Sequence, residues 1–144
     1  MTLEGNLYQP PLGTYRRIVD AEFRMTVPGI WREEPLFKSD EGYISFRRPC
    51  RLVLLPHDFV SRILKGKRKG VGGREKEDIR ILLAALHTVT LDQRGRMTIP
   101  DILVGVIGIG TGDTMVITAT GGWVEIWPAD EWERSRGEKA LFTP

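Results

Sequence analysis

The chain has little cysteine and no long apolar run. Cys50 is the only cysteine among 144 residues, which excludes an internal disulfide and fits a reducing cytoplasm. We expect it to be a small apolar strand residue. The longest apolar stretches, ILLAAL and ILVGVIGIG, are far shorter than the ~20 residues of a membrane span, and the N-terminus lacks the pattern of a signal peptide. We therefore expect a soluble cytoplasmic protein with no membrane partner.

The sequence also lacks the residue sets that catalysis, metals and nucleotide cofactors require. His57 and His87 fall in different predicted elements with no cluster of cysteines or carboxylates around them, so neither a metal site nor nucleophilic catalysis is supported. The GIGTGD stretch lacks the last glycine of a dinucleotide-binding loop, and GKRKGVGGREK lacks the Gly-Lys-Ser/Thr ending of a phosphate-binding loop. We expect no enzyme activity, no cofactor, no metal and no small-molecule substrate.

The net charge is small, +2, but the basic excess is concentrated in one segment. Residues 62–80 carry eight basic and three acidic residues, residues 1–61 carry eight of each, and residues 81–144 carry five basic and eight acidic. The excess is centred on KGKRKGVGGR, residues 65–74. Such a run is typical of a solvated connector, and it is also compatible with attraction to phosphate.

What the sequence does contain is an internal repeat. DAEFRMTVPGIW at 20–31 and DQRGRMTIPDIL at 92–103 share six of twelve positions. We call the separation in sequence from Asp20 to Asp92 the repeat step. The same step carries RLVLLPHDF (51–59) onto WVEIWPADE (123–131), and YISF (43–46) onto MVIT (115–118). One coincidental motif would not keep its phase over this length, so we interpret the chain as two copies of one structural unit.

Each copy is predicted to follow the same order of elements. Alternating residues predict two strands joined by a three-residue hairpin loop, and a short helix then starts at Pro28 or Pro100. Two further strands follow, and a last helix starts at Pro56 or Pro128. Between the copies, REKEDIRILLAALH is typical of an amphipathic helix that docks on the shared core through one apolar stripe, Ile79, Leu82, Leu83 and Leu86.

These elements predict an α+β fold in which two pseudo-symmetric units of β-loop-β-α-β-β-α share one core. Units of this size would be marginal alone, so pairing about a pseudo-twofold axis is the economical way to cover both apolar faces. We place the first repeat at residues 13–65, a basic linker with its helix at 66–87, the second repeat at 88–137 and a C-terminal tail at 138–144.

The hairpin loop of LDQRGRMTIP is the main candidate site. Asp92 ends one predicted strand and Arg96 begins the next, so the carboxylate and the guanidinium should face each other as a bidentate pair. Gly95 takes the loop position that needs a positive φ, and Arg94 is left at the exposed tip. The pair could be a turn-stabilising salt bridge, but its duplication as Asp20 and Arg24 favours contact with a repetitive polyanion.

The paired D-x-x-x-R hairpins, each followed by a strand and proline, with VEIWPADEWE downstream, resemble the MraZ family over about residues 13–132. The resemblance implies two swapped-hairpin β-barrel-like units of AbrB type and a transcriptional regulator of the division and cell-wall gene cluster. It further implies a nucleoid-associated, ring-shaped homo-oligomer that binds tandem promoter repeats of double-stranded DNA. By position, the implied DNA-binding residues are Asp92, Arg94, Arg96, Asp20 and Arg24.

The first copy departs from the family pattern at Glu22 and Phe23. Glutamate at the tip repels phosphate, and phenylalanine tolerates positive φ poorly, so this loop must change type or store strain. Arg16 and Arg17 on the preceding strand are candidate auxiliary DNA contacts. These departures, with the acidic C-terminal part, leave open an alternative: a ring-forming protein-interaction scaffold that has lost specific DNA binding.

Overall fold

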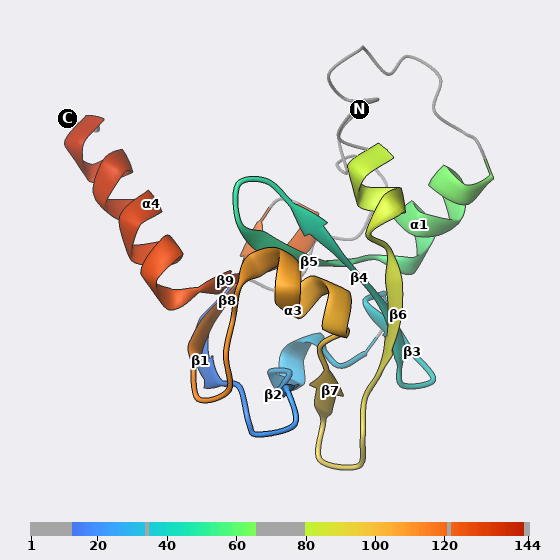
Figure 1. Ribbon diagram of the computed structural model, residues 1–144. Coiled ribbons are helices and arrows are strands. Elements are labelled where there is room, and N and C mark those ends of the chain that lie inside the picture. Colours follow the sequence, from blue (N-terminus) through green and yellow to red (C-terminus); the bar gives the residue numbers. More distant parts are fainter. Residues whose placement is uncertain (1–12, 34, 66–79, 121, 143–144) are drawn as a thin grey trace.

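The computed structural model describes residues 13–33, 35–65, 80–120 and 122–142, and the fold is mixed α+β with a mostly antiparallel sheet (Figure 1). The first half contains β1 (Thr14–Ile18), β2 (Arg24–Thr26), the 3-10 turn η1 (Gly29–Trp31), β3 (Phe37–Lys38), β4 (Glu41–Arg47), β5 (Arg51–Leu55) and α1 (His57–Leu64). The second half contains β6 (His87–Thr90), β7 (Arg96–Thr98), α3 (Asp101–Ile107), β8 (Thr114–Thr120), β9 (Trp123–Pro128) and α4 (Ala129–Phe142).

Strands from the two halves pair with each other rather than only among themselves. The seven-stranded sheet has the order β1-β8-β9-β5-β4-β3, with β6 also paired to β4, and β2 pairs with β7 in a separate two-stranded sheet. Thus β1 lies beside a strand of the second half, and β6 lies beside a strand of the first. Two directly opposed pairs, Met25 with Met97 and Val53 with Glu125, join positions that the repeat step makes equivalent.

The strand bounds shift the sequence alignment by one residue at β4 and β8. The separation from Glu41 to Thr114, where these strands begin, is one residue longer than the separation from Arg51 to Trp123, where β5 and β9 begin. The predicted match of YISF with MVIT is therefore one residue out of register, because the loop between β4 and β5 is one residue longer than its counterpart. The corrected register makes the buried Ser45 equivalent to the buried Thr118.

The helix predicted after Pro28 is wrong in extent. Pro100 is followed by α3, a helix of seven residues, but Pro28 is followed only by the 3-10 turn η1. The sequence after η1 reaches Pro35, which cannot continue a helix because it lacks the backbone N–H. Trp31 at the end of η1 is buried and packs edge-on against the ring of Tyr15, at 5.3 Å between centroids.

Cys50 lies in the turn between β4 and β5, so its predicted place in a strand is wrong. Its Sγ lies 3.6 Å from the carbonyl oxygen of Ile107, and the side chain packs against the main core. Burial raises the pKa of this thiol. The sulfur therefore behaves as a small, half-buried apolar group.

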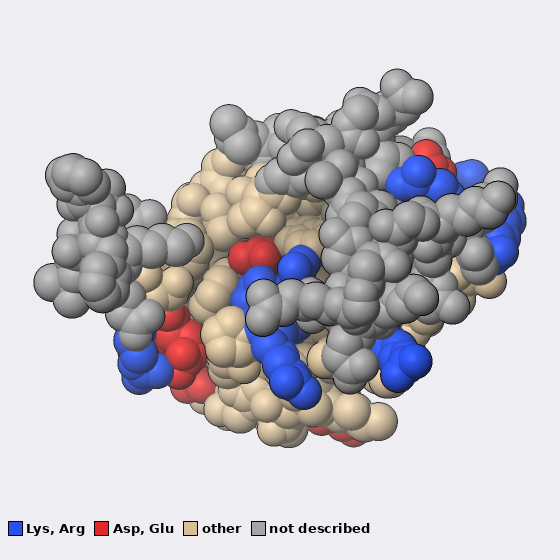
Figure 2. All heavy atoms as spheres, turned by 90° about the horizontal axis from the view of Figure 1, so that it is seen from above, with Lys and Arg blue, Asp and Glu red and all other residues tan. Residues whose placement is uncertain are grey.

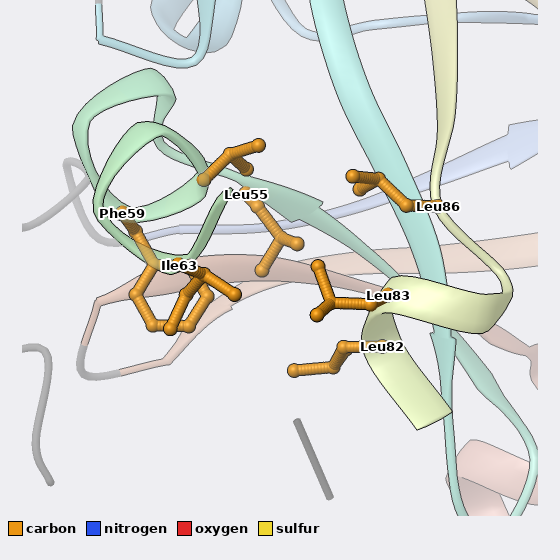
Figure 3. A pocket seen from close by; sticks show the side chains of 7 residues that line it. Leu55, Phe59, Ile63, Leu82, Leu83 and Leu86 are labelled. Atoms are coloured by element: carbon orange, nitrogen blue, oxygen red, sulfur yellow. The ribbon is translucent and has the colours of Figure 1, made fainter. Parts of the chain in front are cut away.

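Two apolar clusters hold the fold together. The larger one draws on both halves of the chain, from Val19 and Met25 to Val124 and Ile126. The smaller one joins α1 and β5 to residues 80–86, of which 80–84 are helical, and Figure 3 shows these side chains converging. Its main members are Leu55, Phe59, Ile63 and Leu82, with Leu83 and Leu86 packed against them.

The stripe predicted for the connecting helix therefore docks on this smaller cluster rather than on the core shared by the two halves. Leu82 is 5% exposed, and the hydroxyl of Ser45 donates to its carbonyl oxygen at 2.6 Å. Residues 66–79, which include Ile79 and all of the basic run (65–74) except its first residue, fall outside the described residues. At the other end of the chain, α4 runs out from the sheet and continues to Phe142, past the last residue of the predicted second repeat (Figure 1).

Candidate functional site

The hairpin between β6 and β7 is built around the carboxylate of Asp92. One oxygen, Oδ1, accepts the backbone N–H groups of Arg94 and Arg96, both at 2.9 Å, and Oδ2 accepts Nε of Arg96 at 2.8 Å. Gly95 has φ +74°, as its place in the loop predicts. The predicted facing of Asp92 and Arg96 is confirmed, but the pair is not bidentate, because the guanidinium bonds only Oδ2 while Oδ1 is used by the backbone.

The hairpin between β1 and β2 has the same geometry. Oδ1 of Asp20 accepts the backbone N–H groups of Glu22 and Arg24 at 2.9 Å, and Oδ2 accepts Nε of Arg24 at 2.8 Å. Phe23 occupies the position of the glycine and has φ 58°. The loop therefore keeps its type and stores strain, of about 1–3 kcal/mol for a non-glycine residue in this region. The phenyl ring packs against the main core.

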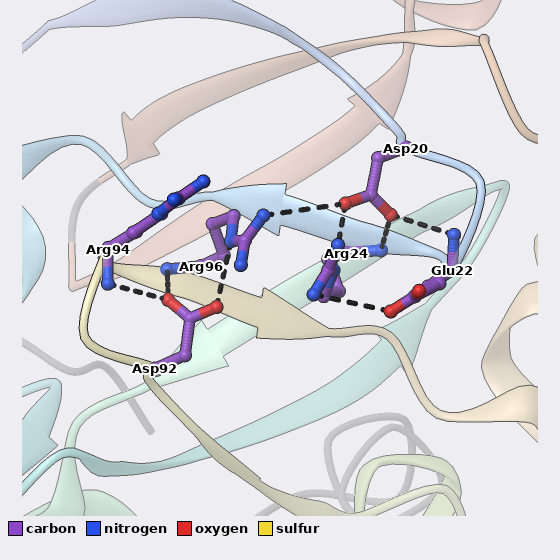
Figure 4. A network of polar contacts seen from close by, with 6 residues as sticks. All are labelled: Asp20, Glu22, Arg24, Asp92, Arg94 and Arg96. Atoms are coloured by element: carbon purple, nitrogen blue, oxygen red, sulfur yellow. Dashed lines mark hydrogen bonds and ion pairs between the residues drawn. The ribbon is translucent and has the colours of Figure 1, made fainter.

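The two hairpins lie at opposite ends of the short β2–β7 ribbon and project from the same side of the body, the lower side in Figure 1. Backbone bonds tie each loop to the other half: Val27 N–H donates to the carbonyl of Gly95 at 2.9 Å, and Ile99 N–H donates to that of Phe23 at 2.8 Å. The Nη1 atom of Arg96 also lies 4.0 Å from Oδ2 of Asp20. Figure 4 shows the resulting network of both loops.

The charges of the two loops differ although their geometry agrees. At the first loop, Oε2 of Glu22 lies 3.2 Å from Nη1 of Arg24, so two carboxylates share this guanidinium. At the second loop the equivalent tip residue is Arg94, whose side chain is exposed and turned away from Asp92 in Figure 4. The predicted repulsion of phosphate by Glu22 is thus accompanied by partial neutralisation of Arg24, whereas Arg94 stays open to solvent.

Hydrogen bonds hold both aspartates in the charged form. The backbone N–H of Arg96, followed by its side chain and the N–H of Arg94, lowers the pKa of Asp92 from 3.8 to about 2. The N–H of Arg24 is the largest influence that lowers the pKa of Asp20. The hydrogen bond to Asp20 in turn raises the pKa of Arg24. Both loops therefore keep their ion pairs throughout the neutral range.

The titration of Asp92 gives a testable dependence of stability on pH. The folded-state pKa is below the unfolded value, so this group stabilises the fold above about pH 4 and loses its contribution as the pH falls towards about 2. We expect the wild type to melt at a higher temperature than Asp92→Asn at pH 5, with the difference closing by pH ~2. Thermal unfolding of the two proteins across this range checks the prediction, and a difference independent of pH would contradict it.

Arg16 and Arg17 are not brought into the polar network of the loops. Nη2 of Arg16 lies 2.5 Å from Oε1 of Glu133 on α4, and Arg17 donates to the carbonyl oxygen of Arg16. The guanidinium of Arg17 also stacks over the ring of Tyr15, 5.4 Å from its centroid. Their role as auxiliary contacts therefore remains a prediction from sequence, without support from the position of these side chains.

Arg32 lies at the second loop, although the sequence did not mark it. Its Nε donates to the carbonyl oxygen of Val27 at 2.6 Å. Its guanidinium covers Gly95 so closely that a Cβ on this glycine would stand 2.5 Å from Nε and from Nη1. The repeat contains a signal that could have identified Arg32. The two copies differ in residue type at this position, where the repeat step pairs Arg32 with Val104, and they also differ at the loop position, where it pairs Phe23 with Gly95.

Other kinds of site find no support in the described part of the chain. Among residues 13–33, 35–65, 80–120 and 122–142, no three His, Cys, Asp or Glu side chains come together in a way that could hold a metal ion. His57 and His87 each bond a backbone carbonyl, of Glu41 and of Ala85. The helices of these same residues are too short or too polar to cross a lipid bilayer.

The described residues thus define an α+β protein whose halves each present an Asp–Arg hairpin on the same side of the body. The family model described as "MraZ protein, putative antitoxin-like" matches residues 82–142. A protein of Bifidobacterium longum named Transcriptional regulator MraZ is 32% identical over 90% of this chain and 86% of its own length. Proteins of the same name are 30% identical in Christiangramia forsetii, over 86% of this chain and 81% of theirs, and 30% identical in Paenarthrobacter aurescens, over 89% and 87%. The chain belongs to the MraZ family.

Proposed function

We propose that this chain is a sequence-specific transcriptional regulator that binds double-stranded DNA through its Asp–Arg hairpins. The observation that carries the proposal is the second loop, where Asp92 holds Arg96 in place and leaves Arg94 exposed at the tip. Asp20 and Arg24 form the weaker counterpart, because Glu22 also engages Arg24. The relatives named as transcriptional regulators support the same reading.

Arginine side chains on a rigid loop suit this role because a guanidinium binds phosphate oxygens or guanine edges in two places at once. The ribbon of β2 and β7 fixes the spacing of the loops on one side of the body. The opposite side, seen in Figure 2, shows Lys and Arg side chains in separate groups with Asp and Glu side chains among them. What favours the hairpin side as the side that meets DNA is Arg94, which is exposed at the tip of the second loop.

We further propose that the halves are swapped-hairpin units of AbrB type, with the boundaries given by the repeat, and that the chains assemble as a ring. The exchange of β1 and β6 between the halves supports the first part. Such a ring would engage tandem promoter repeats of the division and cell-wall gene cluster with several chains at once. Each chain offers few phosphate contacts, so useful affinity would come from this multivalency.

Multivalent binding predicts a strong dependence on the number of repeats. We expect a duplex of the region upstream of the protein's own gene, with its tandem repeats intact, to bind at least about a hundredfold more tightly than a duplex with one repeat. Fluorescence anisotropy at two salt concentrations measures both, and affinity should fall steeply with salt. Equal affinities would contradict the multivalent mechanism.

The alternative function is a ring-forming scaffold that has lost specific DNA binding, and the ion pair between Glu22 and Arg24 is the observation that favours it. A gel-shift assay with the same upstream duplex, in the presence of an excess of unrelated duplex, separates the two. A specific complex supports the regulator, and its absence at low salt supports the scaffold.

A further inference from the structure

The second hairpin is completed by a side chain from the first half of the chain. Arg32 follows η1, and its guanidinium lies on Gly95 of the opposite half. Two hydrogen bonds accompany the contact: Nε of Arg32 donates to the carbonyl oxygen of Val27, and the N–H of Val27 donates to the carbonyl oxygen of Gly95. We call a hairpin loop together with the residues of the other half that contact it a corner. The space that a side chain at position 95 would need is filled by the guanidinium.

The remaining donors of Arg32 are available to a ligand. Its Nε is used by Val27, and the structure gives Nη1 and Nη2 no hydrogen-bond or ion-pair partner among the described residues. These two nitrogens are not among the fully buried, unpartnered atoms of the described chain, and the residue as a whole is partly exposed. Arg32 thus presents donors beside a loop that already carries Arg94 and Arg96.

The equivalent corner at the first hairpin has the same backbone but different chemistry. The N–H of Ile99 donates to the carbonyl oxygen of Phe23, as that of Val27 does to Gly95. The repeat step replaces Gly95 by Phe23 and Arg32 by Val104, and both of these apolar side chains pack against the main core. The repeat step thus gives the glycine and arginine of the second hairpin two apolar counterparts, phenylalanine and valine, in the other half of the repeat.

The differences in residue type between the copies give the two corners net charges of opposite sign. The first holds Asp20, Glu22 and Arg24, which sum to −1 at neutral pH. The second holds one carboxylate, Asp92, and three guanidinium groups, Arg94, Arg96 and Arg32, which sum to +2. Because attraction to phosphate follows local charge, the two hairpins cannot contribute equally to binding a polyanion.

We infer that Arg32 is a third phosphate-binding arginine of the second hairpin, so that each chain meets DNA mainly through one composite surface built from both halves. This inference rests on the proposed function. Arg32 supplies charge to the surface and also supports the loop, because its guanidinium packs on the glycine that shapes it. The first hairpin keeps the same fold but contributes little attraction.

The test replaces Arg32 by valine, the residue that the repeat step pairs with it. We expect affinity for the upstream duplex to fall about tenfold, the loss of one charge-assisted hydrogen bond. The slope of log affinity against log salt should become shallower by about 0.9 for each chain engaged, because one phosphate contact is lost. Arg32→Lys keeps the charge and should retain the slope. Arg134→Ala, which removes one charge from the exposed part of α4, should leave slope and affinity unchanged.

A purely structural role for Arg32 would lower thermal stability without changing the salt slope, and this outcome would overturn the inference. An unchanged affinity for Arg32→Val, with clear binding by the wild type, would overturn it and leave the proposed function intact. Absence of wild-type binding would overturn both.

A gain of binding tests the inference in the other direction. The triple variant Glu22→Arg, Phe23→Gly, Val104→Arg gives the first hairpin the residues of the second at the positions paired by the repeat step, and it relieves the strain of Phe23, because glycine adopts a positive φ freely. We expect tighter binding by at least about tenfold and a steeper slope, by about 2 for each chain engaged. Val104→Arg alone, with Glu22 and Phe23 unchanged, is the matched control and should gain less. A folded triple variant that binds no better than wild type would contradict the composite surface.

Discussion

Replacing Arg96 by alanine is expected to abolish specific DNA binding while the chain stays folded. The loop should persist, because Oδ1 of Asp92 keeps its two backbone N–H donors and Gly95 keeps its positive φ. What is lost is the guanidinium, and with it the partner of the Asp92 carboxylate, which then stands uncompensated before DNA. A lost bidentate contact costs about 1–3 kcal/mol per chain, and several chains multiply the effect.

We therefore expect the affinity of Arg96→Ala for the upstream duplex to fall at least about a hundredfold, to the level of an unrelated duplex. Anisotropy titrations with both duplexes measure this, and circular dichroism verifies the fold. Arg24→Ala is the matched control, since it removes the same bond from the same geometry in the first loop. Its effect should be much smaller, because Glu22 already engages that guanidinium. Equal losses in the two variants would refute the asymmetry of the hairpins.

The hairpin loops could be predicted from sequence because their structure is determined locally. Asp92 and Gly95 specify the turn through side-chain bonds and backbone freedom within a single short loop, and the structure reproduces it. The first loop shows that these signals are not all required. Asp20 and the bonds of the ribbon hold the same turn with phenylalanine at the glycine position, because burial of the phenyl ring offsets the strain.

Features that depend on contacts between the halves were not predictable from residue patterns. The repeat indicates two similar units, but nothing local indicates that β1 lies beside β8, or that β4 and β8 are shifted by one residue. Arg32 is the clearest case. It stands far from Gly95 in the sequence, in the other copy of the repeat, and its significance appears only when the fold places its guanidinium on that glycine.

A second instance of unequal halves gives the largest expected effect on stability. Val53 and Glu125 are directly opposed on β5 and β9, and the repeat step makes their positions equivalent. One is an ordinary core valine, whereas the other is a buried carboxylate that accepts three N–H groups. Oε2 accepts Nε of Arg51 at 2.9 Å and Nε1 of Trp123 at 3.0 Å, and Oε1 accepts Nε1 of Trp127 at 2.9 Å.

Glu125→Ala would leave all three donors without this acceptor. Arg51 would keep its bond to the carbonyl oxygen of Arg48 and its stacking on Trp127, but its charge would lose the carboxylate that pairs with it in a largely buried site. Breaking such a pair by removing one partner costs about 3–5 kcal/mol. Domains of this size lose about 2–4 °C in melting temperature per kcal/mol, so we expect a decrease of about 10 °C.

The exposed pair of Arg16 and Glu133 is the matched control, because it joins the same residue types where both side chains are more than half exposed. Glu133→Ala should cost less than about 1 kcal/mol, since solvent screens the charges and both groups remain hydrated when separated. Glu125→Gln, which keeps one acceptor oxygen, should fall between the two alanine variants. Thermal and denaturant unfolding of the three proteins give the order. If Glu125→Ala were as mild as Glu133→Ala, the prediction would be wrong. The buried carboxylate would then contribute no more to the free energy of unfolding than a surface charge does.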